Sequence, residues 1–259
     1  MVAKALTIAG SDSGGGAGIQ ADIKTFSAMN VYGASVVTAV TAQNTKAVTA
    51  IYPIPDAVVA AQIRTVLEDM QIDAVKIGML GTPSLIVAVA DALADYQGPI
   101  VLDPVMVAKS GDSLLADSAI HSLKSSLFAR ATLLTPNLPE AAKLVGEGST
   151  EKQAKALLAL GVDAVLIKGG HADGRTCTDH LFYQTGTKDF SAQRVGTQNT
   201  HGTGCSYSSA IAAGLAQGMA LCDAVSRAHA WLHQAIVHAD ELNVGQGQGP
   251  VHHFHGLWK

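Results

Sequence analysis

Hydrophobic residues recur in two alternating patterns along the first two thirds of the chain. Short apolar runs rich in β-branched residues predict strands, and longer stretches with apolar residues every three or four positions predict helices. The predicted strands are Ala5–Ala9, Ser35–Ala42, Ala74–Met79, Ile100–Val105, Thr132–Thr135 and Ala164–Ile167. The predicted helices are Ala17–Met29, Asp56–Met70, Pro83–Tyr96, Ala116–Ala129 and Glu151–Leu160.

The apolar positions within these strands are continuous rather than alternating, which is typical of strands buried on both faces. Their alternation with helices predicts an α/β fold with a mostly parallel central sheet between layers of helices. Binding and catalytic groups of such folds gather at the carboxyl ends of the strands. The residues that follow each predicted strand are therefore the first candidates for binding and catalysis.

The pattern changes after Gly170. The segments Thr178–Tyr183 and Asp189–Val195 flank a polar turn and predict two antiparallel edge strands. Two more helices are predicted, at Ser206–Gln217 and Cys222–Glu241. Since no repeat, linker or low-complexity segment divides the chain, we expect residues 1–259 to form a single domain.

Composition narrows the class of protein. The 259 residues are 48% hydrophobic and only 15% charged, which supplies a large core and excludes a disordered chain. The net charge of −4 comes without any cluster of Lys and Arg, so we expect neither nucleic acid nor a membrane surface as partner. The N-terminal apolar run ends at Gly10, too early for a signal peptide or a membrane span.

The three cysteines have spacings that fit neither a disulfide framework nor a metal site. A reducing compartment suits them, and we expect a cytoplasmic protein that acts on small molecules.

A glycine loop opens the helix predicted near residue 206. The backbone N–H groups around Gly202, Thr203 and Gly204 are expected to converge on one anion at the positive end of the helix dipole. Cys205 falls in the first turn, where the dipole is expected to lower the pKa of a thiol. Taken alone, the same residues would equally suit a helix start with a small buried cysteine.

A second glycine loop, residues 10–18, follows the first strand. It lacks the Lys-Ser/Thr pair of a P-loop, and no acidic residue ends the second strand, as dinucleotide binding would require. Such a loop lets the backbone approach a flat ligand at Gly10. Asp22, one helical turn further on, is a candidate acceptor for a ligand amine or simply a charge near the helix start.

Several strands end in residues suited to a heterocycle. The carboxamide of Gln43 offers a donor beside an acceptor, as one edge of a heterocycle requires. Met79 and Val105 are candidate walls for a ring, although core packing is the default explanation for both. Asp103 stands at a strand end before a proline, a poor place for a core residue, which favours a functional acid.

The next strand ends suit phosphate chemistry. Asn137 and Glu140 have the spacing of a capping box at a helix start. The same two side chains could hold Mg²⁺ through water. Lys168 precedes two glycines and suits a phosphate group.

Long ordered motifs along the whole chain resemble one family. These are Leu6–Asp22, Thr41–Thr45, Lys76–Met79, Asp103–Met106, Thr135–Glu140, Lys168–His171, Asn199–Cys205 and Gly249–His255. The chain is similar in them to the hydroxymethylpyrimidine/phosphomethylpyrimidine kinases of thiamine biosynthesis, within the ribokinase-like superfamily.

The resemblance implies a ribokinase-like three-layer α/β/α fold with an antiparallel edge. It implies ATP-dependent phosphorylation of 4-amino-5-hydroxymethyl-2-methylpyrimidine and of its monophosphate, with ATP and Mg²⁺ as cofactors, in a homodimer. The implied roles are an anion hole and base at Gly202–Cys205, phosphate or ATP contacts at Asp103, Asn137 and Lys168, Mg²⁺ binding at Glu140, and a pyrimidine site at Gly10, Asp22, Gln43, Met79 and Val105.

Three other functions remain open on sequence grounds. The resemblance disfavours a pyridoxal or pyridoxine kinase of the same superfamily, because pyridoxal kinases of similar sequence carry a second cysteine after Met106 and residues 107–111 contain none. A cysteine hydrolase would use Cys205 as nucleophile with His201 or His171 as base. A dinucleotide-dependent oxidoreductase is disfavoured by the missing acid on the second strand. The consecutive histidines within residues 252–255 match no tetrahedral ligand spacing, so we expect packing or surface positions for them.

Overall fold

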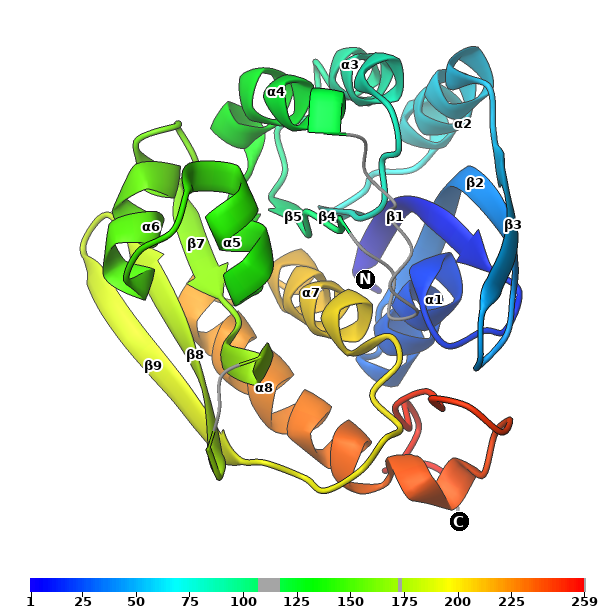
Figure 1. Ribbon diagram of the computed structural model, residues 1–259. Helices are drawn as coiled ribbons and strands as arrows, with labels where there is room; N and C mark the ends of the chain where they lie inside the picture. Colours follow the sequence, from blue (N-terminus) through cyan, green and yellow to red (C-terminus); the bar gives the residue numbers. More distant parts are fainter. Residues whose placement is uncertain (107–116, 172–173, 259) are drawn as a thin grey trace.

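The computed structural model describes residues 1–106, 117–171 and 174–258. Within these residues the strands form one nine-stranded sheet, in the order β3-β2-β1-β4-β5-β6-β7-β8-β9 (Figure 1). The strands are β1 (Lys4–Asp12), β2 (Tyr32–Gln43), β3 (Val48–Pro53), β4 (Ala74–Ile77), β5 (Ile100–Leu102), β6 (Leu133–Leu134), β7 (Ala164–Ile167), β8 (Thr176–Tyr183) and β9 (Gly186–Gln193). The predicted strands are all present, and most differ from the prediction only in length.

The centre of the sheet is parallel and both edges are antiparallel. Strands β2, β1, β4, β5, β6 and β7 pair in parallel. The predicted antiparallel edge is confirmed at β8 and β9. Strand β3 forms a second antiparallel edge beside β2 that the sequence pattern did not predict. Its residues are mostly exposed, so it shows neither a buried apolar run nor a buried alternate face.

Helices cover both faces of the sheet, which confirms the predicted layers (Figure 1). Helices α2 to α6 pack on one face, and α1, α7 and α8 pack on the other. The helices are α1 (Gly18–Ala28), α2 (Asp56–Asp69), α3 (Pro83–Ala92), α4 (Asp117–Ser126), α5 (Leu138–Val145), α6 (Thr150–Leu158), α7 (Thr203–Ala216) and α8 (Leu221–Val237). Ala116, the expected first residue of α4, lies outside the described residues. No helix in the described part of the chain is long and apolar enough to cross a membrane.

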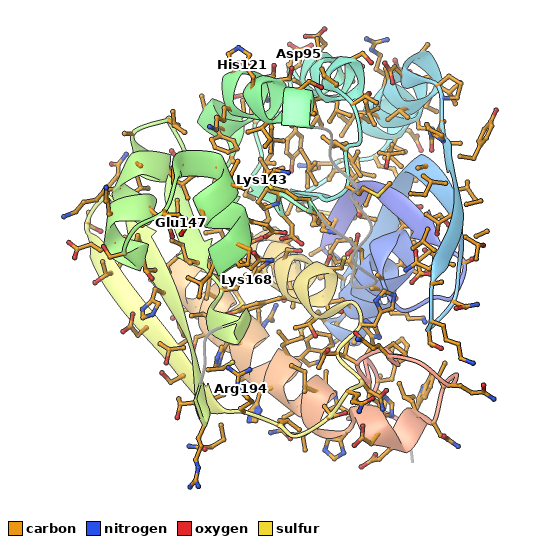
Figure 2. The ribbon with its side chains drawn as sticks, viewed as in Figure 1. Asp95, His121, Lys143, Glu147, Lys168 and Arg194 are labelled. Carbon is orange, nitrogen blue, oxygen red and sulfur yellow. The ribbon has the colours of Figure 1, made fainter. Side chains whose placement is uncertain are left out.

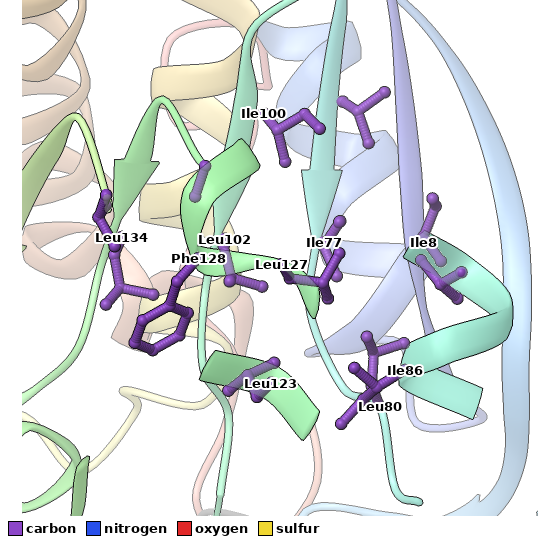
Figure 3. Packing of buried hydrophobic residues seen from close by; sticks show 14 of the residues in the cluster. Ile8, Ile77, Leu80, Ile86, Ile100, Leu102, Leu123, Leu127, Phe128 and Leu134 are labelled. Carbon is purple, nitrogen blue, oxygen red and sulfur yellow. The ribbon is translucent and has the colours of Figure 1, made fainter. Parts of the chain in front are cut away.

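The alternation of side chains along a strand explains how Lys76, a charged residue, lies at the centre of the sheet. Ile8, Ile77 and Leu102 of neighbouring strands pack toward Ile86 and Leu123 on α3 and α4 (Figure 3). Successive side chains of a strand point to opposite faces. Lys76, next to Ile77 on β4, therefore points to the face covered by α1 and α7.

The site is placed by the order of the strands. From β1 the chain adds β2 on one side and later returns to add β4 on the other, so the strand order reverses at β1. Ligands of open α/β sheets bind in the crevice at the carboxyl ends of the strands beside such a point. The loop after β1 and the start of α7 both lie there.

Candidate active site

The two glycine loops touch one another at the start of α7. Gly202 caps this helix in the left-handed conformation, with φ of 76°. A Cβ at Gly202 would lie 1.8 Å from the carbonyl oxygen of Gly16, so only glycine fits. Of the three amides predicted to bind an anion, that of Thr203 already donates to the Thr200 carbonyl oxygen over a long 3.3 Å. An anion would compete with this weak contact.

The thiol of Cys205 does not have the low pKa expected at a helix start. Partial burial raises the pKa of Cys205 to about 11, and the carboxylates of Asp22 and Asp103 add to this effect. The nearby Lys76 ammonium lowers the pKa but does not outweigh them. The expectation of an activated thiolate was wrong, since removal from water outweighs the helix dipole. Cys205 is a neutral thiol at pH 7.

A buried ion pair lies beneath Cys205. The Lys76 ammonium is 2.9 Å from both carboxylate oxygens of Asp22, and both side chains are fully buried. Thr7 on β1 and Ser209 on α7 also donate to Asp22, at 2.6 and 2.7 Å. Burial lowers the pKa of Lys76, but attraction to the carboxylates of Asp22 and Asp103 raises it above its usual range. This pair joins β1, β4, α1 and α7.

The ion pair between Lys76 and Asp22 changes what the sequence led us to expect of each residue. The Asp22 carboxylate already accepts four hydrogen bonds within the protein, so binding a ligand amine would require it to give one up. Lys76 belongs to one of the family motifs, but the sequence predicted no role for it. A lysine in an otherwise apolar strand was the available signal, because a fully buried lysine needs a partner.

A second ion pair lies at the ends of β5 and β7. Lys168 Nζ donates to Asp103 Oδ1 at 2.8 Å, and Thr135 Oγ1 donates to the same oxygen at 3.0 Å. Burial raises the pKa of Asp103, but Lys168 and Lys76 outweigh it, so the pKa falls below its usual range. The Lys168 side chain keeps 14% exposure, near the start of α7 (Figure 2).

The start of α7 faces this second pair. A Cβ added to Gly204 would lie 3.4 Å from Lys168 Nζ and 3.6 Å from Asp103 Oδ2. The structure thus brings together the predicted anion loop and two of the predicted phosphate-binding residues.

Asn137 and Glu140 form the predicted capping box at the start of α5. Glu140 N–H donates to Asn137 Oδ1 and Asn137 N–H donates to Glu140 Oε2, both at 2.8 Å. Burial raises the pKa of Glu140 to about 7, Asp103 adds to this, and Lys168 only partly offsets it. Lys168 is already paired with Asp103, so Glu140 is a buried carboxyl without a full cationic partner.

Asp12 organises the first glycine loop, a role that sequence reasoning missed. Its carboxylate accepts from the amides of Gly14, Gly16 and Ala17 at 2.8 to 3.0 Å. His201 Nε2 lies 2.9 Å from Asp12 Oδ2. An Asp followed closely by glycines is a turn signature that the sequence did offer.

Gln43 reaches the same group of residues. Its amide nitrogen lies 3.3 Å from His201 Nε2 and its amide oxygen 3.1 Å from Thr41 Oγ1. Together with His201 it lines a cavity of about 60 Å³.

The predicted apolar walls lie apart from Gln43. A Cβ on Gly10 would meet Met79 Cε at 3.0 Å, so these two are in close contact. Met79 lines a separate groove of about 400 Å³ between β3 and the start of α3. Val105 is half-buried two residues beyond Asp103. The structure therefore groups Gly10 with Met79 and does not place Gln43 in the same cavity.

The geometry disfavours a cysteine hydrolase. His201 is engaged with Asp12, and a neutral Cys205 is a poor nucleophile. The side chain of His171 and residues 107–111 lie outside the described residues. His252 and His253 are buried, which confirms packing for them, and burial lowers the pKa of His253 to about 3. No group of His, Cys, Asp or Glu among the described residues has the arrangement of a metal site made by protein ligands alone.

Comparison with known proteins assigns the family. The family described as phosphomethylpyrimidine kinase matches residues 12–252. A hydroxymethylpyrimidine/phosphomethylpyrimidine kinase from Rhizobium meliloti is 52% identical, with both chains covered completely. The corresponding protein of Escherichia coli is 51% identical, with 98% of each chain covered.

Solved structures agree on the fold. An ADP complex of a Bacillus subtilis pyridoxal kinase matches with a TM-score of 0.90 at 34% identity, and each chain is covered completely. A phosphomethylpyrimidine kinase from Clostridium difficile matches with a TM-score of 0.80 at 40% identity, over 90% of this chain and 99% of that one. The expected three-layer fold is confirmed, and it is shared by kinases that differ in the acceptor named for them.

Proposed function

This chain is a kinase and belongs to the phosphomethylpyrimidine kinase family, and we propose that it makes hydroxymethylpyrimidine diphosphate in two steps. ATP phosphorylates the hydroxymethyl group of 4-amino-5-hydroxymethyl-2-methylpyrimidine, and a second ATP then phosphorylates the resulting monophosphate. Sequence identity of 51 to 52% to relatives named for these reactions supports this acceptor over pyridoxal.

The observation that carries the proposal is the meeting of the α7 start with two lysine–aspartate pairs. Lys168 and Asp103 face Gly204, and Lys76 with Asp22 lies beside Cys205. Backbone amides at a helix start and a partly exposed ammonium are suited to hold a phosphoryl group. In phosphoryl transfer the protein contributes mainly positioning and charge stabilisation, and one anion-hole donor is worth about 3–4 kcal/mol.

The neutral thiol of Cys205 suits the monophosphate as acceptor. A phosphate monoester reaches the site already ionised, with a second pKa near 6, and needs no base. A carboxylate at this position would repel that dianion, whereas a thiol with a pKa of about 11 adds no charge. Burial keeps the proton on sulfur even before a phosphate is bound.

The residues fit a divalent cation near Glu140. A buried carboxyl whose pKa has risen to about 7 would regain its charge beside a cation. We assign Glu140, with Asn137, to Mg²⁺ through water. The metal would neutralise charge on the phosphates of ATP.

The pyrimidine is assigned to the end of β2 and the loop after β1. A carboxamide matches the amine and ring nitrogen of a 4-aminopyrimidine, so Gln43 is assigned to that edge. Gly10, Met79 and Val105 are assigned to the apolar faces of the ring, which requires a ring bound at Gln43 to reach the separate groove that Met79 lines. Asp22 is also assigned to the pyrimidine site, where its ion pair with Lys76 holds its carboxylate in place.

A homodimer is supported by exposed apolar residues along the β2–β3 edge, with Ile51 41% and Tyr52 69% exposed. Such an edge invites pairing with another chain. Light scattering should give twice the chain mass, and Tyr52→Glu should give one chain mass.

The three cysteines are free, which suits the reducing cytoplasm proposed for this protein.

A coupled ADP-release assay with purified protein tests the function. The acceptors are hydroxymethylpyrimidine, its monophosphate, pyridoxal and ribose. The proposal requires turnover of both pyrimidines. The structural match to a pyridoxal kinase makes pyridoxal the relevant competitor, and a higher kcat/KM for pyridoxal would reverse the assignment.

A further inference from the structure

Both ends of the Gln43 carboxamide face a neighbour of the wrong hydrogen-bonding type. His201 Nε2 lies 2.9 Å from Asp12 Oδ2. That carboxylate already accepts from three backbone amides, and the His201 hydrogen bond, together with backbone amides, lowers the pKa of Asp12 although burial opposes this. An ionised carboxylate only accepts hydrogen bonds. His201 Nε2 must therefore carry a hydrogen.

This fixes what His201 offers to Gln43. The Gln43 amide nitrogen lies 3.3 Å from the same His201 Nε2, so a donor faces a donor. The other end of the carboxamide is mismatched too. Thr41 Oγ1 has one hydrogen and is 2.9 Å from the Ser11 carbonyl oxygen, which only accepts. Thr41 then has no hydrogen left for the Gln43 oxygen at 3.1 Å.

One rotation resolves both mismatches. The two ends of a carboxamide are nearly equal in size, so their positions are decided by the surrounding hydrogen bonds. Turned by 180°, the Gln43 nitrogen donates to Thr41, and the Gln43 oxygen shares the one hydrogen of His201 Nε2 with Asp12, as the longer branch of a three-centre hydrogen bond at 3.3 Å. Each end keeps one further position, a lone pair on oxygen and a hydrogen on nitrogen.

We infer that His201, held by Asp12, is a positioning residue that locks the Gln43 oxygen toward the first glycine loop and so sets which pyrimidine edge is accepted. This rests on the proposed function of Gln43. The locked oxygen accepts from an exocyclic amine, and the nitrogen donates to the adjacent ring nitrogen. A pyrimidine with the reversed pattern would meet donor against donor and acceptor against acceptor.

The test compares two acceptors that differ only at this edge. One is 4-amino-5-hydroxymethyl-2-methylpyrimidine, and the other is its 4-oxo analogue, with a carbonyl in place of the amine and a hydrogen on the adjacent ring nitrogen. The readout is the ratio of their kcat/KM values. Wild type should favour the amine by about tenfold or more, since two hydrogen bonds are mispaired otherwise.

Single substitutions distinguish an effect on the orientation of the Gln43 carboxamide from a general loss of activity. His201→Leu removes one constraint and Thr41→Val, nearly isosteric, removes the other, so each should bring the ratio toward one. His201→Gln keeps a donor and should retain part of the preference. Ser13→Ala is the matched control, because the exposed Ser13 hydroxyl bonds only the backbone of Gln43, at 2.8 and 2.9 Å, and its loss should leave the ratio unchanged.

The outcomes are distinct. If His201→Leu does not fold, Thr41→Val alone decides. A wild-type-like ratio in every folded variant of His201 and Thr41 would overturn the inference, as would equal use of the two analogues by wild type. Failure of the proposed function would show differently, as no turnover of the amino compound by wild type.

Discussion

Replacing Glu140 by glutamine separates its observed role as a helix cap from its proposed role in binding Mg²⁺. Glutamine keeps an oxygen that can accept from Asn137 N–H, so the capping box survives while the charge is lost. If Glu140 served only as a cap, activity and its Mg²⁺ requirement would change little. If it binds the metal through water, we expect the apparent Mg²⁺ affinity to fall by about 10- to 100-fold, as for other residues that act on a metal indirectly.

The raised pKa of Glu140 predicts a pH profile. With a pKa of about 7, roughly a tenth of the side chains are ionised at pH 6 and about nine tenths at pH 8. Activity at limiting Mg²⁺ should therefore rise about tenfold between these values in the wild-type protein. The Glu140→Gln variant should lack this step.

The same pKa predicts an effect on stability. Burial raises the pKa of Glu140 from 4.5 to about 7, so between these values the folded chain holds a proton that the unfolded chain has lost. This contribution to stability is complete below pH 4.5 and is lost as the pH rises to 7. At about 1.4 kcal/mol per pH unit, ionisation of Glu140 costs about 3 kcal/mol.

The assay is urea unfolding of both proteins between pH 4.5 and 8, without metal. The difference between them isolates Glu140, because other groups titrate in both. Glu140→Gln should gain about 2–3 kcal/mol relative to wild type as the pH rises. Glu151→Gln, an exposed glutamate in the first turn of α6, is the control and should show no such gain. A pH-independent difference for Glu140→Gln, together with an unchanged Mg²⁺ requirement, would refute the metal role.

Three further predictions concern the rest of the site. Gln43→Leu should raise the KM for the pyrimidine at least about tenfold with the KM for ATP unchanged, and an unaltered pyrimidine KM would remove Gln43 from the site. Cys205→Asp should keep phosphorylation of the hydroxymethyl compound but lose that of the monophosphate, and equal losses measured by ADP release would contradict the charge argument. Lys76→Met should lower the free energy of unfolding by about 3–5 kcal/mol, because Asp22 is left buried and unpaired. Adding Asp22→Asn should recover most of this loss in urea unfolding, and an unchanged stability of Lys76→Met would contradict the prediction.

Sequence pattern was sufficient for the layers and for the positions of most candidate site residues at the ends of strands and helices. Strands such as Ala164–Ile167 are uniformly apolar because they are buried on both faces, and Lys168 follows directly at the carboxyl end. Strand β3 was missed because it is short, exposed and held by the backbone of β2, which leaves no periodic signal. Residue patterns report burial, and β3 is barely buried.

Electrostatic properties were harder to predict than positions. The position of Cys205 at a helix start was correctly inferred, but its pKa depends on Asp22 and Asp103, which are distant in sequence. The partner of Lys76 comes from another element in the same way. Asp12 and His201 stand 189 residues apart in the chain, so no local pattern could have paired them.

The proposed function requires one site to phosphorylate first an alcohol and then a phosphate. The most direct measurement is ³¹P NMR of the wild-type protein with the pyrimidine monophosphate as sole acceptor, ATP and Mg²⁺. We predict the paired signals of a pyrimidine diphosphate, formed together with ADP, and their loss in Cys205→Asp. A monophosphate signal that persists in the presence of ATP and Mg²⁺, with neither diphosphate nor ADP formed, would contradict the proposed reaction.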